Sequence, residues 1–308
     1  MTISVDPRVP VQSTRAAVLI PFAIVTLIWG STWIVIRDQL AVVPPSWSVT
    51  YRFLTGGLTM LAYAAWKREA LPRDLRGIGF AALLGLAQFV LNFNLVYRAE
   101  QHVTSGLVAV VFALLLVPNA ILGRIFLGQH LGRQLLVGSA VAIAGVALLF
   151  LQEARAAPRG TAEVLVGVGL TLSAIMSAST ANIMQGTATA RAYPMAPMLG
   201  LAMLIGAGLD AAFAWATTGP PVIELRPAYL IGILYLGVIA SAIAFTLYFQ
   251  LIRVIGTAKA AYSSVLIPVI AMLFSTLFEA YRWSGLAVSG ALLALAGLVI
   301  ALRARRPA

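Results

Sequence analysis

Two ionisable side chains stand inside long apolar stretches of this sequence, where each could do chemistry. Arg52 lies about six residues into one stretch, and Asp210 lies toward the end of another. A charge at the centre of a bilayer costs at least about 2.5 kcal/mol, so such a residue faces a cavity or a partner. Arg52 is interpreted either as an arginine that reaches the outer headgroups or as an anchor for a substrate carboxylate. Asp210 is interpreted either as a buried salt-bridge or hydrogen-bond partner or as a proton-coupling carboxylate.

Uncharged polar side chains are more numerous near the centres of the apolar stretches. Asn92 and Asn182 are the most informative, because an amide with several hydrogen-bonding valences is costly to leave unpaired in a dry interior. We expect both to line a cavity. Ser177 belongs to a ladder of small residues at every fourth position, which by itself indicates close helix packing. The candidate binding residues are Trp29, Gln88, Asn92, Phe93, Ser177, Asn182, Ser241, Phe245 and Tyr262.

The aromatic members of this set predict the chemistry of a ligand. Few charges and several rings favour a neutral or zwitterionic solute with apolar bulk, because aromatic walls offer dispersion and stacking. An aromatic or other neutral amino acid fits this description. A hydrophobic drug fits it as well, and the composition does not separate the two.

The segment IWGSTW, residues 28–33, places two tryptophans one helical turn apart. Trp33 is close enough to the outer interface to belong to an aromatic belt, whereas Trp29 is too deep for that role and is predicted to form a wall of the substrate site. Ser31 and Thr32 are expected to bond back to carbonyls one turn earlier. Gly30 leaves room for a neighbouring backbone or a substrate.

These residues must be positioned by helices in a membrane. The 308-residue chain is 61% hydrophobic and 10% charged, with a mean hydropathy of +0.95. Runs of about 20 apolar residues can cross a bilayer. The predicted fold is an all-α integral membrane protein with ten transmembrane helices. The predicted spans are 18–36, 46–66, 75–97, 103–122, 134–151, 164–187, 195–216, 228–250, 258–278 and 284–302.

The distribution of positive charge predicts the orientation. With a cytoplasmic N-terminus, 14 of the 21 Lys and Arg residues fall on the inside, which is the positive-inside signature. Both the tail 1–17 and the basic tail 303–308 are therefore expected in the cytoplasm. The net charge of +11 is explained by topology and requires no nucleic-acid partner. A strong preference for Arg over Lys favours a bacterial source, and so a bacterial inner membrane.

An internal repeat divides the chain into halves. An offset of 152 residues aligns Gly85 with Gly237, Phe93 with Phe245, and Gly138 with Gly290. The predicted repeats are 18–152 and 153–302. Because each holds five helices, an odd number, the two must insert in opposite orientations. Inverted repeats are typical of alternating-access transporters with a substrate site near the midplane.

Further residues are candidates for gating. Pro118 and Pro268 interrupt corresponding spans, and a proline frees a backbone carbonyl and bends a helix. A packing kink is the alternative explanation. Lys259 stands at the cytoplasmic start of its span and is interpreted as an orientation anchor or as a gating cation. With Arg52 and Asp210, these three residues form the candidate gating or coupling set.

Four stretches give the sequence a family resemblance. They are IWGSTWIVIRDQL, YRFLTGGL, the long segment from YLGVIASAIAF to STLFEA, and SGLAVSGALLALAGLVI. The chain resembles the EamA-type transporters of the drug/metabolite transporter superfamily, and within it the exporters of aromatic and neutral amino acids. The resemblance implies a ten-helix exporter with both termini inside. Such families carry a Gly-Glu pair after the proline helix of each half, whereas this chain has Gly128-Gln129 and Phe278-Glu279.

An intramembrane enzyme and a purely structural membrane scaffold are the rival classes, and a scaffold would not need bent helices in inverted halves. A serine protease needs a deep histidine, and an aspartyl protease needs two neighbouring carboxylates. His102 and His130 lie near span ends, and Asp210 has no second membrane aspartate. The sequence therefore predicts no enzyme, metal site or cofactor. The expected partners are a small-molecule substrate and membrane lipid, and the oligomeric state is left open, with a monomer compatible.

Overall fold

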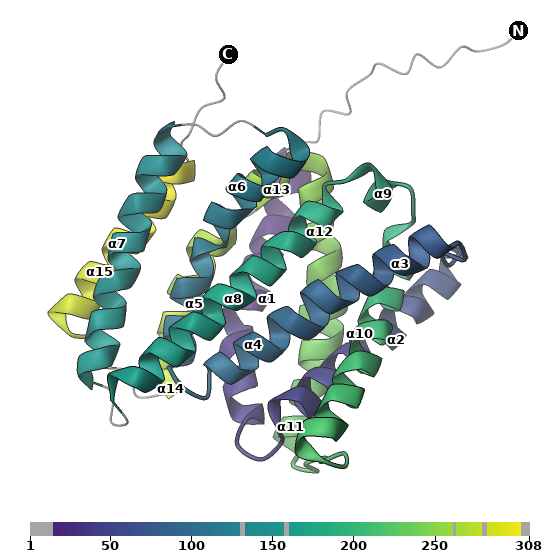
Figure 1. The fold of residues 1–308 in the computed structure, drawn as a ribbon, viewed down its shortest axis with the longest axis horizontal. Coiled ribbons are helices and arrows are strands. Elements are labelled where there is room, and N and C mark those ends of the chain that lie inside the picture. The colour runs from purple at the N-terminus through teal and green to yellow at the C-terminus, as the bar shows by residue number, and fades with distance from the viewer. Residues whose placement is uncertain (1–14, 130–132, 157–159, 261–262, 279–281, 303–308) are drawn as a thin grey trace, which may run out of the picture.

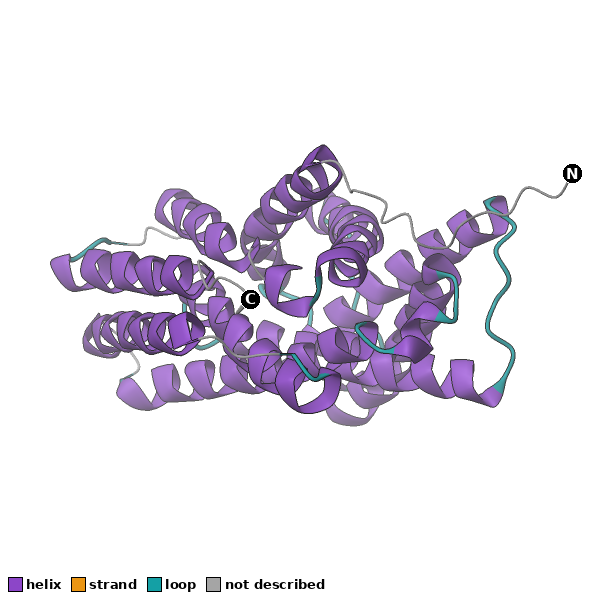
Figure 2. Cartoon of the chain, turned by 90° about the horizontal axis from the view of Figure 1, so that it is seen from above, coloured by secondary structure: helices purple, strands orange, loops and turns teal. Residues whose placement is uncertain are grey.

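The computed structural model describes residues 15–129, 133–156, 160–260, 263–278 and 282–302, and within these ranges the ordered elements are helices (Figures 1 and 2). Their bounds are α1 Arg15–Gln39, α2 Pro45–Trp66, α3 Leu75–Leu84, η1 Gly85–Leu91, α4 Asn92–Ala99, α5 Ser105–Phe112, η2 Ala113–Leu115, α6 Leu116–Leu127, α7 Arg133–Ala156, α8 Thr161–Gln185, α9 Ala188–Arg191, α10 Met195–Thr218, α11 Pro227–Leu234, η3 Tyr235–Ile243, α12 Ala244–Ile255, α13 Thr257–Ala260, α14 Ser263–Phe278 and α15 Gly285–Leu302. The all-helical prediction is confirmed for this part of the chain.

Six helical stretches among the described residues are long and apolar enough to cross a membrane. They are Val18–Gln39, Leu75–Ala99, Ser105–Leu127, Thr161–Gln185, Met195–Thr218 and Pro227–Ile255. Leu136–Leu149 and Gly285–Gly297 are shorter apolar helices. Although α2 has 22 residues, its first two turns hold Ser46, Ser48 and Thr50 as well as Arg52, which makes it less apolar. The predicted count of ten spans is therefore larger than the six that meet this description.

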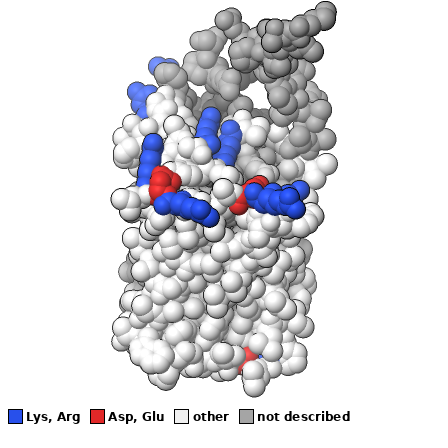
Figure 3. Space-filling model, turned by 90° about the vertical axis from the view of Figure 1, so that its right-hand side faces the viewer, with Lys and Arg blue, Asp and Glu red and all other residues white. Residues whose placement is uncertain are grey.

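On the face drawn in Figure 3, most of the Lys and Arg side chains lie in the upper part, a broad uncharged surface extends below them, and an acidic side chain lies at the lower edge. The connection from α2 to α3 contributes the exposed Lys67, Arg68 and Arg73. An uncharged surface of this kind is what a helical protein presents to hydrocarbon.

Two of the long helices contain a π-helical segment, and each segment comes close to a neighbouring helix. η1 follows α3 and begins at Gly85, where an added Cβ would lie 2.5 Å from the Ala202 carbonyl oxygen of α10. η3 follows α11 and contains Gly237, where an added Cβ would lie 2.9 Å from the Arg52 carbonyl oxygen of α2. Glycine therefore permits both close approaches. π-Helical turns are frequent at functional sites.

A short 3₁₀ turn marks the position of Pro118. η2 separates α5 from α6, and Pro118 is the third residue of α6. Because a proline lacks its N–H and its ring clashes with the carbonyl four residues earlier, the disturbance falls on Leu114, within the 3₁₀ turn. Pro268 stands inside α14. The 3₁₀ turn beside Pro118 interrupts the α-helical pattern, as the sequence indicates, whereas α14 continues through Pro268.

Candidate functional site

A cavity of about 90 Å³ lies between several helices in the interior of the molecule. Its walls come from α1, α2, η1, α4, α5, η2, α8, α12 and α14. The lining residues are Trp29, Thr32, Trp33, Ile36, Arg52, Gln88, Asn92, Phe93, Val96, Ala109, Phe112, Ala113, Leu115, Ala178, Asn182, Phe245, Tyr248 and Ile267. Most of these side chains are apolar or aromatic, and Arg52 alone among them is charged.

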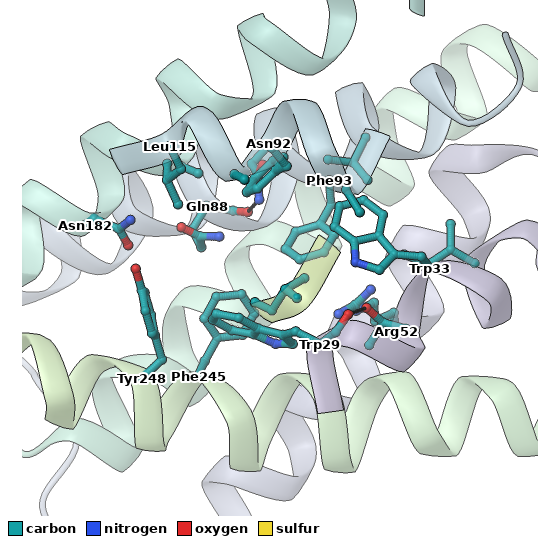
Figure 4. A pocket seen from close by; sticks show the side chains of 18 residues that line it. Trp29, Trp33, Arg52, Gln88, Asn92, Phe93, Leu115, Asn182, Phe245 and Tyr248 are labelled. Carbon is teal, nitrogen blue, oxygen red and sulfur yellow. Dashed lines mark hydrogen bonds between the residues drawn. The ribbon is translucent and has the colours of Figure 1, made fainter. Parts of the chain in front are cut away.

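The labelled residues of Figure 4 show how the polar groups are distributed along the cavity. Trp33 and Arg52 lie together at one end, and Asn182 and Tyr248 lie at the other. Gln88 and Asn92 occupy the wall between the two ends, on the η1–α4 helix, while Trp29 and Phe245 lie across from them. The cavity therefore has two polar ends joined by a mixed amide and aromatic middle.

The structure brings most of the predicted binding residues to this cavity. Six of the nine line it, namely Trp29, Gln88, Asn92, Phe93, Asn182 and Phe245. Ser177 and Ser241 are absent from the lining and make helix contacts instead, as described below. Tyr262 lies outside the described residues. The expectation that both asparagines line a cavity is met.

The two serines stabilise the π-helical segments. Ser177 of α8 donates to the Ala87 carbonyl of η1 at 2.7 Å, and Ser241 of η3 donates to the Leu236 carbonyl at 2.7 Å. π-Helical turns disturb the regular carbonyl pairing of a helix, and hydroxyls are suited to satisfy the groups concerned. Ser177 is therefore a packing residue in this structure, in agreement with the small-residue ladder.

Rings form a continuous wall around the middle of the cavity. The Trp29 ring centroid lies 5.1 Å from that of Phe245 and 4.9 Å from that of Tyr248. Phe93 and Phe245 are 6.1 Å apart. The Trp29 indole N–H donates to the Ala240 carbonyl of η3 at 3.1 Å, which fixes the ring. Ring pairs at these separations are favourable contacts in tilted or edge-to-face arrangements.

The interpretation of Trp33 as an interfacial residue is wrong. Its side chain is 7% exposed, lies 5.9 Å from the Phe112 ring and lines the cavity, and its indole N–H has no hydrogen-bond partner. Because α1 continues to Gln39, Trp33 lies more than a turn before the helix end and on the same face as Trp29. The spacing of four residues between Trp29 and Trp33 indicates that both side chains lie on the same face of α1. The short distance of Trp33 from the expected membrane interface, taken alone, led to the wrong placement.

Arg52 is buried in the interior and does not extend to the headgroups. Its side chain is 1% exposed, and its Nε donates to the Ser241 hydroxyl at 3.0 Å. The guanidinium carbon lies 4.3 Å from the centroid of the Phe93 ring, a cation–π distance. Its Nη1 has no hydrogen-bond partner. Of the two interpretations of Arg52, only the one in which it faces a cavity agrees with this position.

The opposite end of the cavity is formed by amides and a phenol. The Asn182 Nδ2 donates to the Asn119 Oδ1 at 3.4 Å, and the Tyr248 hydroxyl interacts with both amides. Tyr248 is one of the aromatic residues that the sequence places along the path, but it is not in the nine-residue binding set, although it lies three residues after Phe245 on the same helix face. That spacing was a usable signal for it.

Asp210 belongs to a separate polar cluster next to the cavity. The fully buried Asp210 accepts from the Asn94 Nδ2 at 2.6 Å. The Asn94 Oδ1 in turn accepts from Arg98 at 2.8 Å and from the Ser46 hydroxyl at 2.7 Å. This cluster joins α10 to α4 and α2, and none of its members lines the cavity. The predicted buried hydrogen bond of Asp210 is confirmed.

The remaining gating candidates do not line the central cavity. Pro118 borders an apolar cavity of about 570 Å³ beside α6, α7 and α8, and Pro268 borders one of about 510 Å³ beside α5, α14 and α15. The backbone of Lys259 lies in α13, and its side chain is outside the described part of the chain.

The two hydroxyl residues of the segment IWGSTW bond back to carbonyls of α1, as expected. Thr32 donates to the Trp29 carbonyl, and Ser31 donates to the Leu27 and Ile28 carbonyls.

Comparison with known proteins decides the family. The model of the EamA-like transporter family matches residues 16–151 and again residues 165–303. The chain belongs to the EamA-like transporter family. Two matches of similar length in one chain agree with a duplicated unit, and together they cover most of the sequence.

Relatives of this EamA chain carry the names of transporters. The "Uncharacterized inner membrane transporter YedA" of Escherichia coli K12 is 30% identical, over 81% of this chain and 79% of its own length. The "Probable amino-acid metabolite efflux pump" of the same strain is 25% identical over 90% of this chain and 92% of its own. A solved crystal structure with 19% identity matches 96% of this chain and 100% of its own, with a TM-score of 0.68, which supports the fold.

One departure from the EamA pattern has a structural counterpart. Gln129 stands where the first-half glutamate is expected, and its Oε1 accepts from the Thr257 hydroxyl of α13 at 3.2 Å. Gly128 before it has a φ of 65°, in the left-handed region that favours glycine at a helix end. Glu279, the second-half counterpart, lies outside the described residues. In the first half, a neutral amide just after α6 therefore bonds to α13 at this position.

Proposed function

We propose that this protein is a secondary transporter that exports small neutral or zwitterionic metabolites, with aromatic and other neutral amino acids as the main substrates. The observation that carries the proposal is the buried cavity, whose aromatic wall and unpaired amide oxygens suit a solute with a ring and a few polar groups. The relatives named as probable amino-acid metabolite efflux pumps support the same substrate class. A bacterial inner membrane is the proposed location, as the name of the YedA relative suggests.

We further propose ten transmembrane helices in two inverted repeats, 18–152 and 153–302, with the tails 1–17 and 303–308 in the cytoplasm. Symmetric contacts between α7 and α15 support this arrangement. An added Cβ on Gly145 would lie 2.2 Å from the Ala294 nitrogen, and one on Gly297 would lie 2.2 Å from the Ala142 nitrogen. Both pairs are related by the same offset of 152 residues. Reciprocal contacts of this kind are expected when two equivalent helices pack around a pseudo-twofold axis.

Transport in this proposal proceeds by alternating access. The cavity volume of about 90 Å³ holds a few water molecules, whereas pockets for drug-sized ligands measure roughly 300–1,000 Å³. A bound aromatic solute therefore requires the walls to move apart. Pro118, Pro268 and Lys259 are proposed to act in this movement. Arg52 and Asp210 complete the proposed gating or coupling set.

The proposal is tested by counterflow in liposomes. Purified protein is reconstituted with unlabelled phenylalanine inside, and the uptake of radiolabelled phenylalanine is measured against protein-free liposomes. We expect uptake well above the protein-free level, with threonine transported more slowly. Trp29→Ala should lower the rate about two- to tenfold, the equivalent of one lost aromatic pair.

Trp66→Ala is the matched control for this experiment. Trp66 is 74% exposed at the end of α2 and lies away from the cavity, so its removal should leave the rate unchanged. An absence of flux for every member of a panel of amino acids and hydrophobic drugs contradicts the transporter proposal. Flux of drugs without flux of amino acids supports the multidrug alternative.

A further inference from the structure

We propose that Arg52 and Trp33 form a carboxylate subsite at one end of the cavity, and that the substrates are aromatic carboxylates, with or without an amino group. This inference rests on the proposed transport function and specifies its substrate class. It assigns the cavity a direction, with the carboxylate at the Arg52 end and the ring against Trp29 and Phe245. It also predicts that amines lacking a carboxylate are poor ligands.

The first observation is that Arg52 has no salt-bridge partner in the part of the chain that the structure describes. Ser241, which accepts from Nε at 3.0 Å, and the Tyr97 hydroxyl are uncharged neighbours of the guanidinium. Among the described residues, no carboxylate forms a salt bridge with Arg52, and Nη1 has no partner. A guanidinium that is 1% exposed and forms no salt bridge is energetically unfavourable in an apolar surrounding. An anion that enters the cavity relieves this cost.

The second observation is that another unpaired donor stands beside Arg52. The Trp33 indole N–H has no partner, although the side chain is 7% exposed. Figure 4 shows the Trp33 indole and the Arg52 guanidinium together at the same end of the cavity. The Trp29 indole N–H is different, since it is bound to the Ala240 carbonyl. Two convergent free donors match the two oxygens of a carboxylate.

The third observation is that the unpaired acceptors lie elsewhere and are neutral. The Gln88 Oε1 and the Asn92 Oδ1 have no partners, and both residues lie in the wall between the two ends (Figure 4). These oxygens can accept from an amino group, but neither of them carries a countercharge for it. No aspartate or glutamate is among the lining residues of the described chain. The carboxylate of a substrate therefore contributes more to binding than its ammonium group does.

A series of ligands with one shared ring tests the subsite without any mutation. The probes are phenylalanine, 3-phenylpropionate, phenylalaninamide and 2-phenylethylamine, and binding to the purified full-length protein is measured by tryptophan fluorescence or thermal stabilisation. We expect the two carboxylates to bind about 10- to 100-fold more tightly than the amide and the amine, as for a charge-assisted hydrogen-bonded pair. Equal affinities, tighter binding of the amide or the amine, or no binding of any probe would overturn the subsite.

Variants of Arg52 assign the preference to this residue. Arg52→Gln should lower the affinity for phenylalanine to about that of the wild type for phenylalaninamide, while the affinity for the amide itself stays unchanged. Arg253→Gln is the matched control, because Arg253 is a half-buried arginine with an unpaired Nε that does not line the cavity. A preference for the acid that survives in Arg52→Gln contradicts the assignment. If Arg52→Gln fails to fold, Arg52→Lys replaces it and should keep part of the preference.

The outcomes for this subsite and for the transport proposal are distinct. Flux of phenylalanine without any preference for the carboxylate overturns the subsite and leaves the transporter in place. Binding with the expected preference but without flux supports the subsite and contradicts transport. Binding with the preference together with flux supports both.

Discussion

At the scale of single residues, buried polar groups in this chain are sorted into two sets. One set lines the cavity, as Arg52 and Gln88 do, and the other set lies outside its lining and bonds to groups of neighbouring helices, as Asp210 does to Asn94. The sequence marked all three as exceptional because polar groups are rare within apolar helices. It could not tell the sets apart, because pairing depends on which residues of distant helices meet.

Asp210→Asn tests whether its cluster has a structural or a coupling role. Asp210 accepts a hydrogen bond from Asn94, and the Asn94 Oδ1 accepts one from Arg98. Asp210 does not line the cavity. We therefore expect the variant to lose about 1–3 kcal/mol of stability, since a charge-assisted bond is weakened. The ratio of phenylalanine flux with and without a proton gradient should stay at the wild-type value. Both quantities are measured on the reconstituted protein.

Asp38→Asn is the control for the same measurement. Asp38 is an exposed carboxylate that binds Arg226 at 2.9 Å at the end of α1, so its loss should change neither quantity appreciably. If the dependence on the gradient disappears in Asp210→Asn alone, Asp210 is a coupling residue and the structural interpretation is wrong.

At the scale of elements, the positions of the helices could be predicted, and their irregularities could not. Long apolar runs locate a membrane helix well, as the bounds of α8 and α10 show. The π-helical segments η1 and η3 leave no mark in such runs, because one additional residue per turn hardly changes the average hydropathy. The sequence repeat pairs the glycines of these segments, Gly85 and Gly237. The structure shows in addition that a neighbouring helix approaches closely at each of them.

Gly85→Ala tests the importance of the approach between η1 and α10. The added methyl would lie 2.5 Å from the Ala202 carbonyl oxygen, a backbone atom that cannot move aside easily, so we expect a loss of about 1–3 kcal/mol and a lower melting temperature in detergent. Gly79→Ala is the matched control, since Gly79 lies in α3 of the same long helix and has open space around it. It should be neutral or slightly stabilising, because alanine favours helix. Equal effects of the two changes would contradict the packing argument.

At the scale of the whole molecule, two groups of connections lie at opposite ends of the helices. The α2–α3 connection meets the α9–α10 connection, where the Tyr193 hydroxyl donates to Asp74 at 2.5 Å and lowers the pKa of that carboxyl. The α10–α11 connection meets the end of α1 instead, through Arg226 and Asp38. The connections that follow the second helix of each proposed repeat therefore lie at opposite ends of the molecule, as inverted halves require.

Cysteine labelling can place these ends relative to the membrane, because the chain has no cysteine of its own. Arg73→Cys lies after the second helix of the first half, and Leu225→Cys lies after the second helix of the second half; both positions are exposed. A membrane-impermeant maleimide added to intact cells should label Leu225→Cys and should label Arg73→Cys only after permeabilisation. The positive charges around Arg73 favour the cytoplasmic side. Labelling of both positions from the same side would contradict the inverted repeat, and exchanged sides would reverse the proposed orientation while leaving the repeat intact.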